Sequence, residues 1–305
     1  MTAHEPYSGV LPAMVTPFHD DGSIDFDSLA ADAQRLERAG VDGLVPVGST
    51  GESATLTHDE HVQVVETVSG AVEDVSVIAG SGSNNTAEAL ELSERSAEAG
   101  ADGLLLISPY YNRPEPEGME HHYREIADAV DLPQVIYNVP GRTGRDIAVE
   151  TAVSLADHEN VVGYKAASGD LGRISEVVER TRDAAFSVLS GDDGMTLPTL
   201  SVGGTGAISV VANVEPERTC AMAGAALAGD YERARALHHE LGPLMRALFA
   251  ESNPIPVKEA MAIRGHCEPH LRSPLSRASE GVREELEGLL DELDSSPAVE
   301  VGVEA

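Results

Sequence analysis

The most constraining feature of this sequence is a regular alternation of short Val-, Ile- and Leu-rich runs with longer amphipathic segments. The runs recur roughly every 25–30 residues, which is the length of one strand–helix unit. Their almost continuous apolar character is typical of parallel strands that helices cover on both faces. We predict strands at 10–16, 43–47, 76–79, 103–107, 134–137, 161–165, 186–190 and 206–210.

Eight alternating strand–helix units favour a closed (β/α)₈ TIM barrel, which is an α/β fold. The structural alternative is an open doubly wound sheet. Local signals agree with intervening helices. Thr57 and Glu60 have the spacing of a capping box at a helix start. Gly40 and Gly100 each follow an alanine, as glycines do where helices end.

The chain changes character after the eighth unit. We assign residues 1–229 to the barrel and 230–294 to a C-terminal helical appendage. Within the appendage, Asn253-Pro254-Ile255-Pro256 separates two helices and 280–293 forms a third. Residues 295–305 have no periodicity and are expected to form a flexible tail.

The charge balance narrows the classes of function. The chain has 52 acidic and 20 basic residues, a formal net charge of −32. Such a protein repels phosphate, so we expect no nucleic-acid partner. The acids are spread along the whole chain, which favours adaptation to high salt, where screening weakens self-repulsion. No run approaches the roughly 20 apolar residues of a membrane span, and no signal peptide is recognisable. Cys220 and Cys267 lack the spacing of a metal site, so we expect no bound metal. Two isolated cysteines suit a reducing compartment, and with the two preceding observations they predict a cytoplasmic protein without a membrane partner.

Lysine is almost absent, because Lys165 and Lys258 are the only two in the chain. A surface lysine is easily replaced by arginine, whereas an amine that forms a Schiff base is not, since guanidinium stays protonated. Lys165 ends the sixth predicted strand, and the active sites of such barrels lie at the C-terminal ends of the strands. Burial there lowers a lysine pKa and yields a nucleophilic amine. The alternative is a lysine paired with a carboxylate at the barrel rim.

Other polar residues follow neighbouring strands. Tyr137 is a candidate proton shuttle, although a core tyrosine is the simpler interpretation. Ser49 and Thr50 are candidates for a proton relay or carboxylate binding, or else they only cap a turn. Arg142 is suited to hold a substrate carboxylate through two hydrogen bonds, or else it is a surface arginine. The glycines of Gly203-Gly204-Thr205-Gly206 weakly suggest a phosphate cradle.

At this point the chain resembles the 4-hydroxy-tetrahydrodipicolinate synthase family, also called dihydrodipicolinate synthase, of the pyruvate-dependent N-acetylneuraminate lyase group. The likeness runs from about residue 9 to 258, and Lys165 stands where the family has its strand-six lysine. The motifs that carry it are Gly48-Ser49-Thr50-Gly51-Glu52, Pro109-Tyr110-Tyr111-Asn112-Arg113-Pro114, Tyr137-Asn138-Val139-Pro140-Gly141-Arg142-Thr143-Gly144 and Asn253-Pro254-Ile255-Pro256-Val257-Lys258.

The resemblance implies a lyase of lysine and diaminopimelate biosynthesis. It would condense pyruvate with L-aspartate 4-semialdehyde to give 4-hydroxy-tetrahydrodipicolinate, with no cofactor beyond a Lys165–pyruvate imine. It also implies a homo-oligomer, a tetramer of dimers, because the family's second tyrosine comes from a neighbouring subunit. Ser49 stands where many members have threonine, so the hydroxyl is kept and the methyl is lost. The implied catalytic residues are Lys165, Tyr137, Ser49 and Tyr111, and the implied substrate-binding residues are Thr50, Arg142, Gly191 and Ile208.

A second set of residues matches the position at which some family members bind the feedback inhibitor L-lysine. In this chain Glu88 could pair with an ammonium and Tyr110 with a carboxylate, or the residues form an ordinary polar dimer contact. The histidines of this set have no further ligand spacing that would indicate a metal. The set is Ser53, Ala54, His58, His61, Asn84, Glu88 and Tyr110.

Three rival functions stay open at this point. A 2-keto-3-deoxy sugar acid aldolase of the same superfamily shares the lysine and the tyrosine, but generally lacks the arginine at 142. A non-catalytic sensor of lysine or of keto acids would use the same pocket without chemistry. A phosphate-binding isomerase barrel is supported only by the glycines of 203–206.

Overall fold

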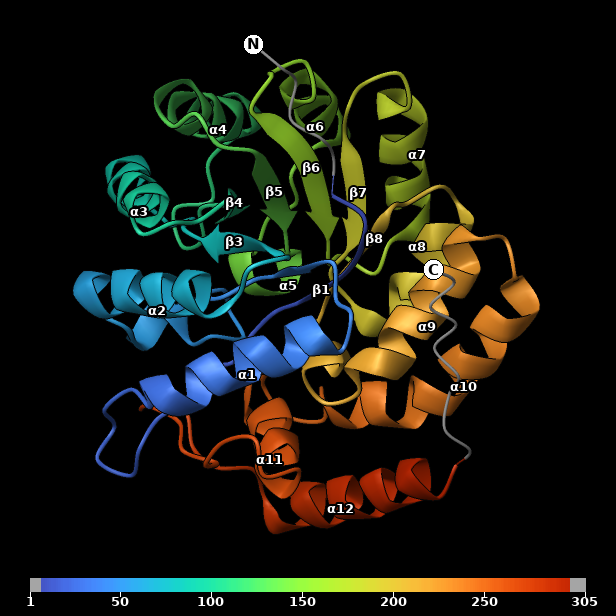
Figure 1. Cartoon of the computed structure of the whole chain (residues 1–305). Coiled ribbons are helices and arrows are strands. Elements are labelled where there is room, and N and C mark those ends of the chain that lie inside the picture. Colours follow the sequence, from blue (N-terminus) through green and yellow to red (C-terminus); the bar gives the residue numbers. More distant parts are fainter. Residues whose placement is uncertain (1–6, 297–305) are drawn as a thin grey trace.

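A computed structural model describes residues 7–296 as a closed barrel surrounded by helices (Figure 1). All of its strand pairs are parallel, and the order around the sheet is β1-β8-β7-β6-β5-β4-β3-β2. The strands are β1 Gly9–Pro12, β2 Gly43–Leu44, β3 Ser76–Gly80, β4 Gly103–Ile107, β5 Gln134–Asn138, β6 Val161–Ala166, β7 Ser187–Ser190 and β8 Gly206–Ser209.

The ring closes between β1 and β2 through a short contact. Ala13 and Val45 form an isolated parallel bridge, and the Val45 amide donates to the Pro12 carbonyl at 2.9 Å. This closure confirms the predicted TIM barrel and excludes the open sheet. The predicted runs 10–16 and 43–47 extend beyond β1 and β2, because beyond the bridge both segments leave the ladder and turn toward the barrel mouth.

Helices cover the outside of the barrel, as the amphipathic segments predict. The capping box is present: the Thr57 hydroxyl accepts from the Glu60 amide, and the Glu60 carboxylate accepts from the Thr57 amide. Gly40 and Gly100 follow helix ends with φ of 80° and 95°. The helices of the barrel are α1 Phe26–Arg38, α2 His58–Ala71, α3 Thr86–Glu98, α4 Pro116–Ala129, α5 Pro140–Thr143, α6 Val149–Leu155, α7 Leu171–Thr181, α8 Thr196–Ser201 and α9 Pro216–Leu227.

The C-terminal segment adds α10 Tyr231–Ala247, α11 Ile255–Ile263 and α12 Glu280–Ser295. Figure 1 shows α11 and α12 on one side of the barrel, below α1 and α10 in that view. The prediction that only helices follow residue 230 is wrong for 264–279, which has no helix and contains Pro269 and Pro274. The helix predicted at 280–293 continues to Ser295, so the predicted tail starts too early. Residues 297–305 of that tail and residues 1–6 of the predicted barrel lie outside the described residues.

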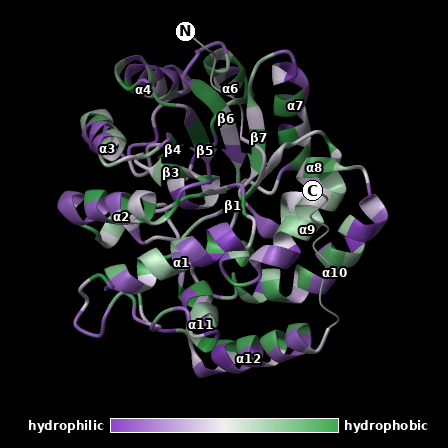
Figure 2. Cartoon of the chain, in the orientation of Figure 1, coloured by the Kyte–Doolittle hydropathy of each residue, from purple (hydrophilic) through white to green (hydrophobic). Residues whose placement is uncertain are grey.

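Apolar clusters outside and inside the barrel hold this architecture together. The larger apolar cluster lies between the strands and α1 to α7, and a second cluster joins α9 to α12 with the C-terminal end of the barrel. In Figure 2 the helices show apolar and polar stripes, whereas β6 is largely apolar. A third, small cluster that includes Leu11, Ile78 and Leu189 fills the barrel interior below the mouth. The mouth therefore rests on a solid apolar floor.

Candidate active site

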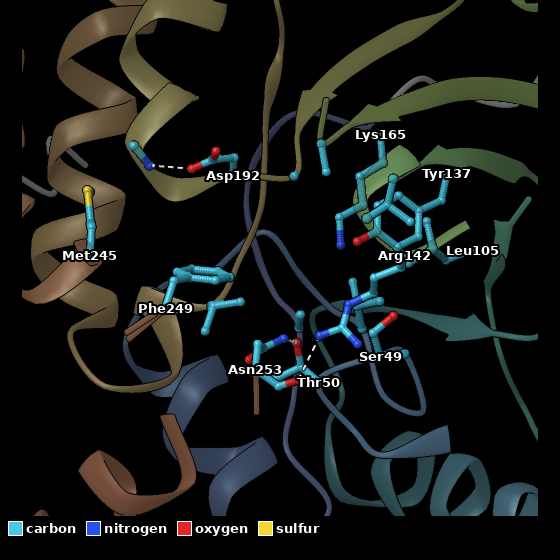
Figure 3. Close-up of a pocket in the computed structure, with 18 of the residues that line it drawn as sticks. Ser49, Thr50, Leu105, Tyr137, Arg142, Lys165, Asp192, Met245, Phe249 and Asn253 are labelled. Carbon is cyan, nitrogen blue, oxygen red and sulfur yellow. Dashed lines mark hydrogen bonds between the residues drawn. The ribbon is translucent and has the colours of Figure 1, made fainter. Parts of the chain in front are cut away.

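Lys165 lines a cavity of about 600 Å³ at the C-terminal end of the barrel (Figure 3). It is the fifth residue of the six in β6, and its side chain is only 5% exposed. The β6 backbone is paired on both sides, with Tyr137 of β5 and Leu189 of β7 opposite Lys165. The predicted placement at the barrel mouth is confirmed, and the alternative of a lysine paired with a carboxylate at the rim is wrong. Among residues 7–296, Lys165 makes no ion pair and no hydrogen bond.

Burial dominates the electrostatics of this amine. Desolvation lowers the pKa of Lys165 to about 7, and the positive charge of Arg142 acts in the same direction. The carboxylate of Asp193 opposes the shift, because a nearby negative charge favours the protonated amine. A substantial fraction of free amine is therefore present at neutral pH. That is the requirement for attack on a carbonyl carbon.

Tyr137 lies directly beside the amine. The Lys165 Nζ is 4.2 Å from the centre of the Tyr137 ring, and the two side chains converge in Figure 3. Burial raises the pKa of Tyr137 to about 12, so its hydroxyl keeps its proton at neutral pH. The position and the protonation state both suit a group that gives a proton to a carbonyl oxygen and takes it back.

The turn after β2 supplies hydroxyl groups to the opposite wall of the cavity. Ser49 and Thr50 both line it, and the Thr50 Oγ1 accepts a hydrogen bond from the Asn253 Nδ2 at 2.9 Å. The Asn253 carbonyl accepts a second hydrogen bond, from the Arg142 Nη2 at 2.7 Å. Figure 3 shows both bonds, which join the turn, α5 and the loop before α11. Arg142 thus reaches the cavity from α5, as predicted.

Gly191 allows the lysine to take its position. A Cβ at Gly191 would stand 2.9 Å from the Lys165 Cε and 3.0 Å from the Cγ, closer than real Cβ contacts. Two residues later, the buried Asp193 accepts from the Ser209 Oγ at 2.6 Å and from the Val211 amide at 2.9 Å. The β7–α8 loop therefore holds a fixed carboxylate close enough to the amine to influence its pKa. Ile208, which was predicted beside Gly191, is buried in β8 and is not among the residues that line the cavity.

Tyr111 does not reach this cavity. It lies in the loop after β4, is 88% exposed, and has a left-handed φ of 42°. The structure of one chain therefore brings together Lys165, Tyr137 and Ser49 but leaves the fourth predicted catalytic residue in solvent.

The residues of the predicted lysine site lie together outside the barrel mouth. His58 at the start of α2 is 3.1 Å from a Glu88 oxygen of α3, and the other Glu88 oxygen accepts from the Ser83 hydroxyl. Asn84 accepts from the Asn112 amide at 3.2 Å, which places the loop carrying Tyr110 beside them. His61 is buried, and desolvation lowers its pKa to about 4. Ser53 and Ala54 belong to the 3₁₀ turn Ser53–Thr55, which comes just before α2.

One wall of the cavity consists of residues that no sequence pattern indicated. Side chains of α10 and of the segment after it line the side opposite β5, together with Asn253. These residues lie far from the lysine along the chain, and no motif or periodicity relates them to it. The only available signal was Asn253, which begins a quoted motif. The missed α10-side residues are His238, Gly242, Met245, Arg246 and Phe249.

The proposed phosphate cradle has a different explanation. Gly203–Gly206 leads into the N-terminal end of β8, opposite the mouth, whereas barrel ligands bind at the C-terminal ends. A Cβ at Gly206 would lie 2.2 Å from the Gly9 carbonyl oxygen, so close packing against β1 requires this glycine. Within residues 7–296, no group of three or more His, Cys, Asp or Glu side chains is arranged to hold a metal ion. None of the helices described is long and apolar enough to cross a bilayer.

Comparisons with known proteins agree with this geometry. A family model described as the Dihydrodipicolinate synthetase family matches residues 6–293. A 4-hydroxy-tetrahydrodipicolinate synthase of Haloarcula marismortui is 70% identical over 295 residues, which cover 97% of this chain and 96% of the relative. A chloride-inhibited dihydrodipicolinate synthase from Acinetobacter baumannii, solved with pyruvate, has a TM-score of 0.92 and 40% identity and covers 94% of this chain and 99% of its own. The enzyme from Cyanidioschyzon merolae, solved with lysine bound, has a TM-score of 0.89 and 38% identity and covers 93% and 97%.

Proposed function

The chain belongs to the dihydrodipicolinate synthetase family, and on that premise we propose that Lys165 is its Schiff-base nucleophile. The protein is a pyruvate-dependent lyase that condenses pyruvate with L-aspartate 4-semialdehyde in lysine and diaminopimelate biosynthesis. The rival readings as a sugar-acid aldolase or a non-catalytic sensor therefore give way to this enzyme. The observation that carries the proposal is the buried amine of Lys165, which is without an ion-pair partner among residues 7–296 and faces a cavity of about 600 Å³.

The chemistry follows from the positions of these groups. The free Lys165 amine attacks the keto carbon of pyruvate, and the resulting carbinolamine loses water to form an imine. Loss of a proton from the methyl group gives an enamine, whose carbon attacks the aldehyde of the semialdehyde. The amine of that substrate then displaces Lys165 and closes the ring. We assign the proton transfers to Tyr137, which lies beside the amine, and to Ser49, which lines the opposite wall of the same cavity.

Borohydride trapping tests the nucleophile directly. With pyruvate and borohydride, intact-mass spectrometry should show one added pyruvyl group, and peptide mapping should place it on Lys165. The chain offers few competing amines, because Lys258 is the only other lysine. Lys165→Arg should abolish the adduct. An adduct that persists in this variant, or that maps to Lys258, would overturn the assignment.

The two carboxylates of the substrates need separate partners. We assign the pyruvate carboxylate to Thr50 and the turn that carries it, and the semialdehyde carboxylate to Arg142, whose guanidinium lines the same cavity. Arg142→Lys should raise KM for the semialdehyde more than KM for pyruvate, because a point charge replaces a planar fork. Equal changes in both KM values would contradict this division. A parallel assay with 2-keto-3-deoxygluconate, for which no turnover is expected, checks the substrate class.

We also propose that the site is completed by Tyr111 of a second copy of this chain. The 88% exposure of Tyr111 and its left-handed φ of 42° are unusual for a large aromatic residue. A partner that buries this ring would compensate both the exposure and the backbone strain. The arrangement we expect is a pair of chains that exchange Tyr111, within a tetramer of two such dimers.

Subunit complementation distinguishes this exchange from a site within one chain. Tyr111→Phe and Lys165→Arg should each be nearly inactive alone. Unfolded and refolded together in equal amounts, they should recover about a quarter of the wild-type sites, because half of the dimers are mixed and each mixed dimer has one intact site. No recovery, with mixed dimers demonstrated by native mass spectrometry, would place the tyrosine in its own chain's site.

L-Lysine is the regulatory ligand we propose for the cluster around Glu88. Its ammonium would meet the Glu88 carboxylate beside His58, and its carboxylate would meet the hydroxyl of Tyr110, a residue that is 40% exposed. The solved relative with lysine bound supports this class of ligand. Calorimetry should detect millimolar or tighter lysine binding that Glu88→Gln weakens. The absence of both heat and inhibition at millimolar lysine would remove the proposal.

Salt dependence and location follow from the charge of the chain. We propose that the enzyme works at high ionic strength in the cytoplasm, because a net charge of −32 opposes both folding and association until salt screens it. Sedimentation at decreasing salt concentrations should show dissociation before unfolding. A protein that stays associated and active at low salt would contradict the halophilic assignment.

A further inference from the structure

The turn that carries Ser49 and Thr50 is held in strained backbone. Val47 before it and Glu52 after it both have left-handed φ values, 50° and 54°. Such angles are unfavourable for a residue with a side chain, and above all for a β-branched one such as Val47. Strain of this kind persists only where surrounding contacts fix the backbone, so this turn must be held by its neighbours.

The space around the turn leaves it little freedom. A Cβ at Gly51 would lie 3.0 Å from the Val47 nitrogen, and a Cβ at Gly80 of β3 would lie 2.6 Å from the Val47 carbonyl oxygen. On the side of β1, the Thr16 hydroxyl donates to the Gly51 carbonyl at 2.7 Å. These contacts pack the turn against the barrel but do not explain what fixes its final residue, Glu52.

Glu52 is fixed by Lys258, the second lysine of the chain. Lys258 of α11 is fully buried, and its Nζ donates to a Glu52 carboxylate oxygen and to the Thr16 carbonyl at 2.7 Å. The other Glu52 oxygen accepts from the Arg272 amide at 3.0 Å. The Lys258 amine also lies 4.3 Å from the centre of the Phe18 ring. One buried ion pair therefore joins the end of the turn to α11, to the segment after β1 and to the segment 264–279.

We infer that the Glu52–Lys258 pair positions the 48–51 turn for catalysis, so that Lys258 is a positioning residue acting through Ser49. Neither residue of the pair lines the cavity, although the Glu52 amide donates to the Ser49 carbonyl at 3.3 Å, and the inference rests on the proposed function. The pair fixes Glu52, which directly follows the 48–51 turn and lies three positions after Ser49. Asn253, which binds the Thr50 hydroxyl, lies five positions before Lys258, so both attachments of the turn come from the start of α11.

The surroundings of the Lys258 amine favour a lysine over an arginine at this position. The Lys258 side chain and the Glu52 side chain are both 0% exposed. A guanidinium is larger than an ammonium and carries five N–H donors, whereas three contacts satisfy the Lys258 amine here: Glu52, Thr16 and Phe18. An arginine would have to displace one of these three groups. The limited space and the small number of hydrogen-bond acceptors around the Lys258 amine therefore favour lysine over arginine at this position.

A double-mutant cycle tests whether the pair acts through the turn. Lys258→Met and Glu52→Gln are each made in the wild type and in a Ser49→Ala background, and kcat, KM and thermal unfolding are measured for every protein. Displacement of the turn should lower kcat about 10–100-fold in the wild type. It should lower kcat less than about threefold when Ser49 has already lost its hydroxyl, because the two changes then damage the same step. Glu52→Gln, which keeps an oxygen for Lys258, should retain more activity than Glu52→Ala.

The matched control is Glu215→Gln. Glu215 is a buried carboxylate that accepts from Arg218 at 2.6 Å and Arg264 at 2.5 Å, away from the turn. The Glu215→Gln variant should be less stable than the wild type, and its kcat should be unchanged. Multiplicative losses of kcat in the Ser49→Ala background, or loss of stability alone, would overturn the inference. Glu52→Gln decides the question if Lys258→Met does not fold. Pyruvate trapping on Lys165 is measured in each variant, so a failure of the proposed nucleophile would be seen separately.

Discussion

The two lysines of this chain occupy similar places but differ in their bonded partners. Both are buried near the barrel mouth, and each amine lies over an aromatic ring, Lys165 at 4.2 Å from Tyr137 and Lys258 at 4.3 Å from Phe18. Lys258 has a carboxylate partner, Glu52, whereas Lys165 has none among residues 7–296. Burial lowers the pKa of both amines, and a carboxylate counteracts the shift at each: Glu52, which is bonded to Lys258, and Asp193, which is not bonded to Lys165. Burial alone therefore does not make a nucleophile, and the absence of an ion-pair partner is the decisive difference.

The largest expected effect comes from removing the hydroxyl that distinguishes the two rings. Tyr137→Phe makes the surroundings of Lys165 resemble those of Lys258, where a phenylalanine lies against the amine. We expect kcat to fall about 10²–10⁴-fold, the usual contribution of a positioned proton-transfer group. Steady-state assays with both substrates measure this. Unchanged turnover would show that the hydroxyl has no role and that the ring only packs.

Replacing each lysine by methionine should change stability in opposite directions. Lys258→Met leaves Glu52 buried without its cation and should lower the free energy of unfolding by about 3–5 kcal/mol. Lys165→Met removes an amine that the fold keeps partly deprotonated, and should raise that free energy by about 1–3 kcal/mol at pH 7. Denaturant titrations of both variants at high salt make the comparison. Two losses of equal size would mean that both amines are structural.

The sign of the second effect can be checked against pH. The folded pKa of Lys165, about 7, is below the model-compound value of 10.5, so the unfolded chain binds the extra proton between these values. The contribution of Lys165 to stability therefore becomes less unfavourable as pH rises from 7 to 10.5. The advantage of Lys165→Met should shrink over the same window.

The comparison also separates what the sequence could predict from what it could not. The run at 103–107 coincides with β4, because a buried parallel strand is apolar at every position, and Lys165 could be placed because it ends such a run. The Glu52–Lys258 pair joins residues 206 positions apart, and no periodicity reports a contact of that range. The influence of the Asp193 carboxylate on Lys165 could not be predicted either, because it depends on the path of the β7–α8 loop. Tyr111 was found only through resemblance, and a single chain leaves it exposed.

A smaller effect is expected in the pH dependence of imine formation. Below pH 7 the rate of borohydride trapping with limiting pyruvate should fall about tenfold per pH unit, because Lys165 becomes protonated. Asp193→Asn should move this profile to lower pH, since the Asp193 charge raises the pKa of Lys165. Glu215→Gln should leave it in place. A midpoint near that of an ordinary lysine would show that burial does not activate the amine.

The smallest expected effect is the response of the same profile to salt. A net charge of −32 favours a protonated amine anywhere in the molecule, and added salt weakens this influence on a cavity that opens to solvent. Lowering the salt from about 1 M to about 0.1 M lengthens the screening distance from about 3 to about 10 Å, so the trapping midpoint of Lys165 should move to higher pH by a few tenths of a unit. The Glu52–Lys258 pair, which is sealed from solvent, should respond less. Its contribution can be followed as the difference in unfolding free energy between wild type and Lys258→Met at the two salt concentrations. A salt response that is larger for the sealed pair than for the open amine would reverse the contrast between the two lysines.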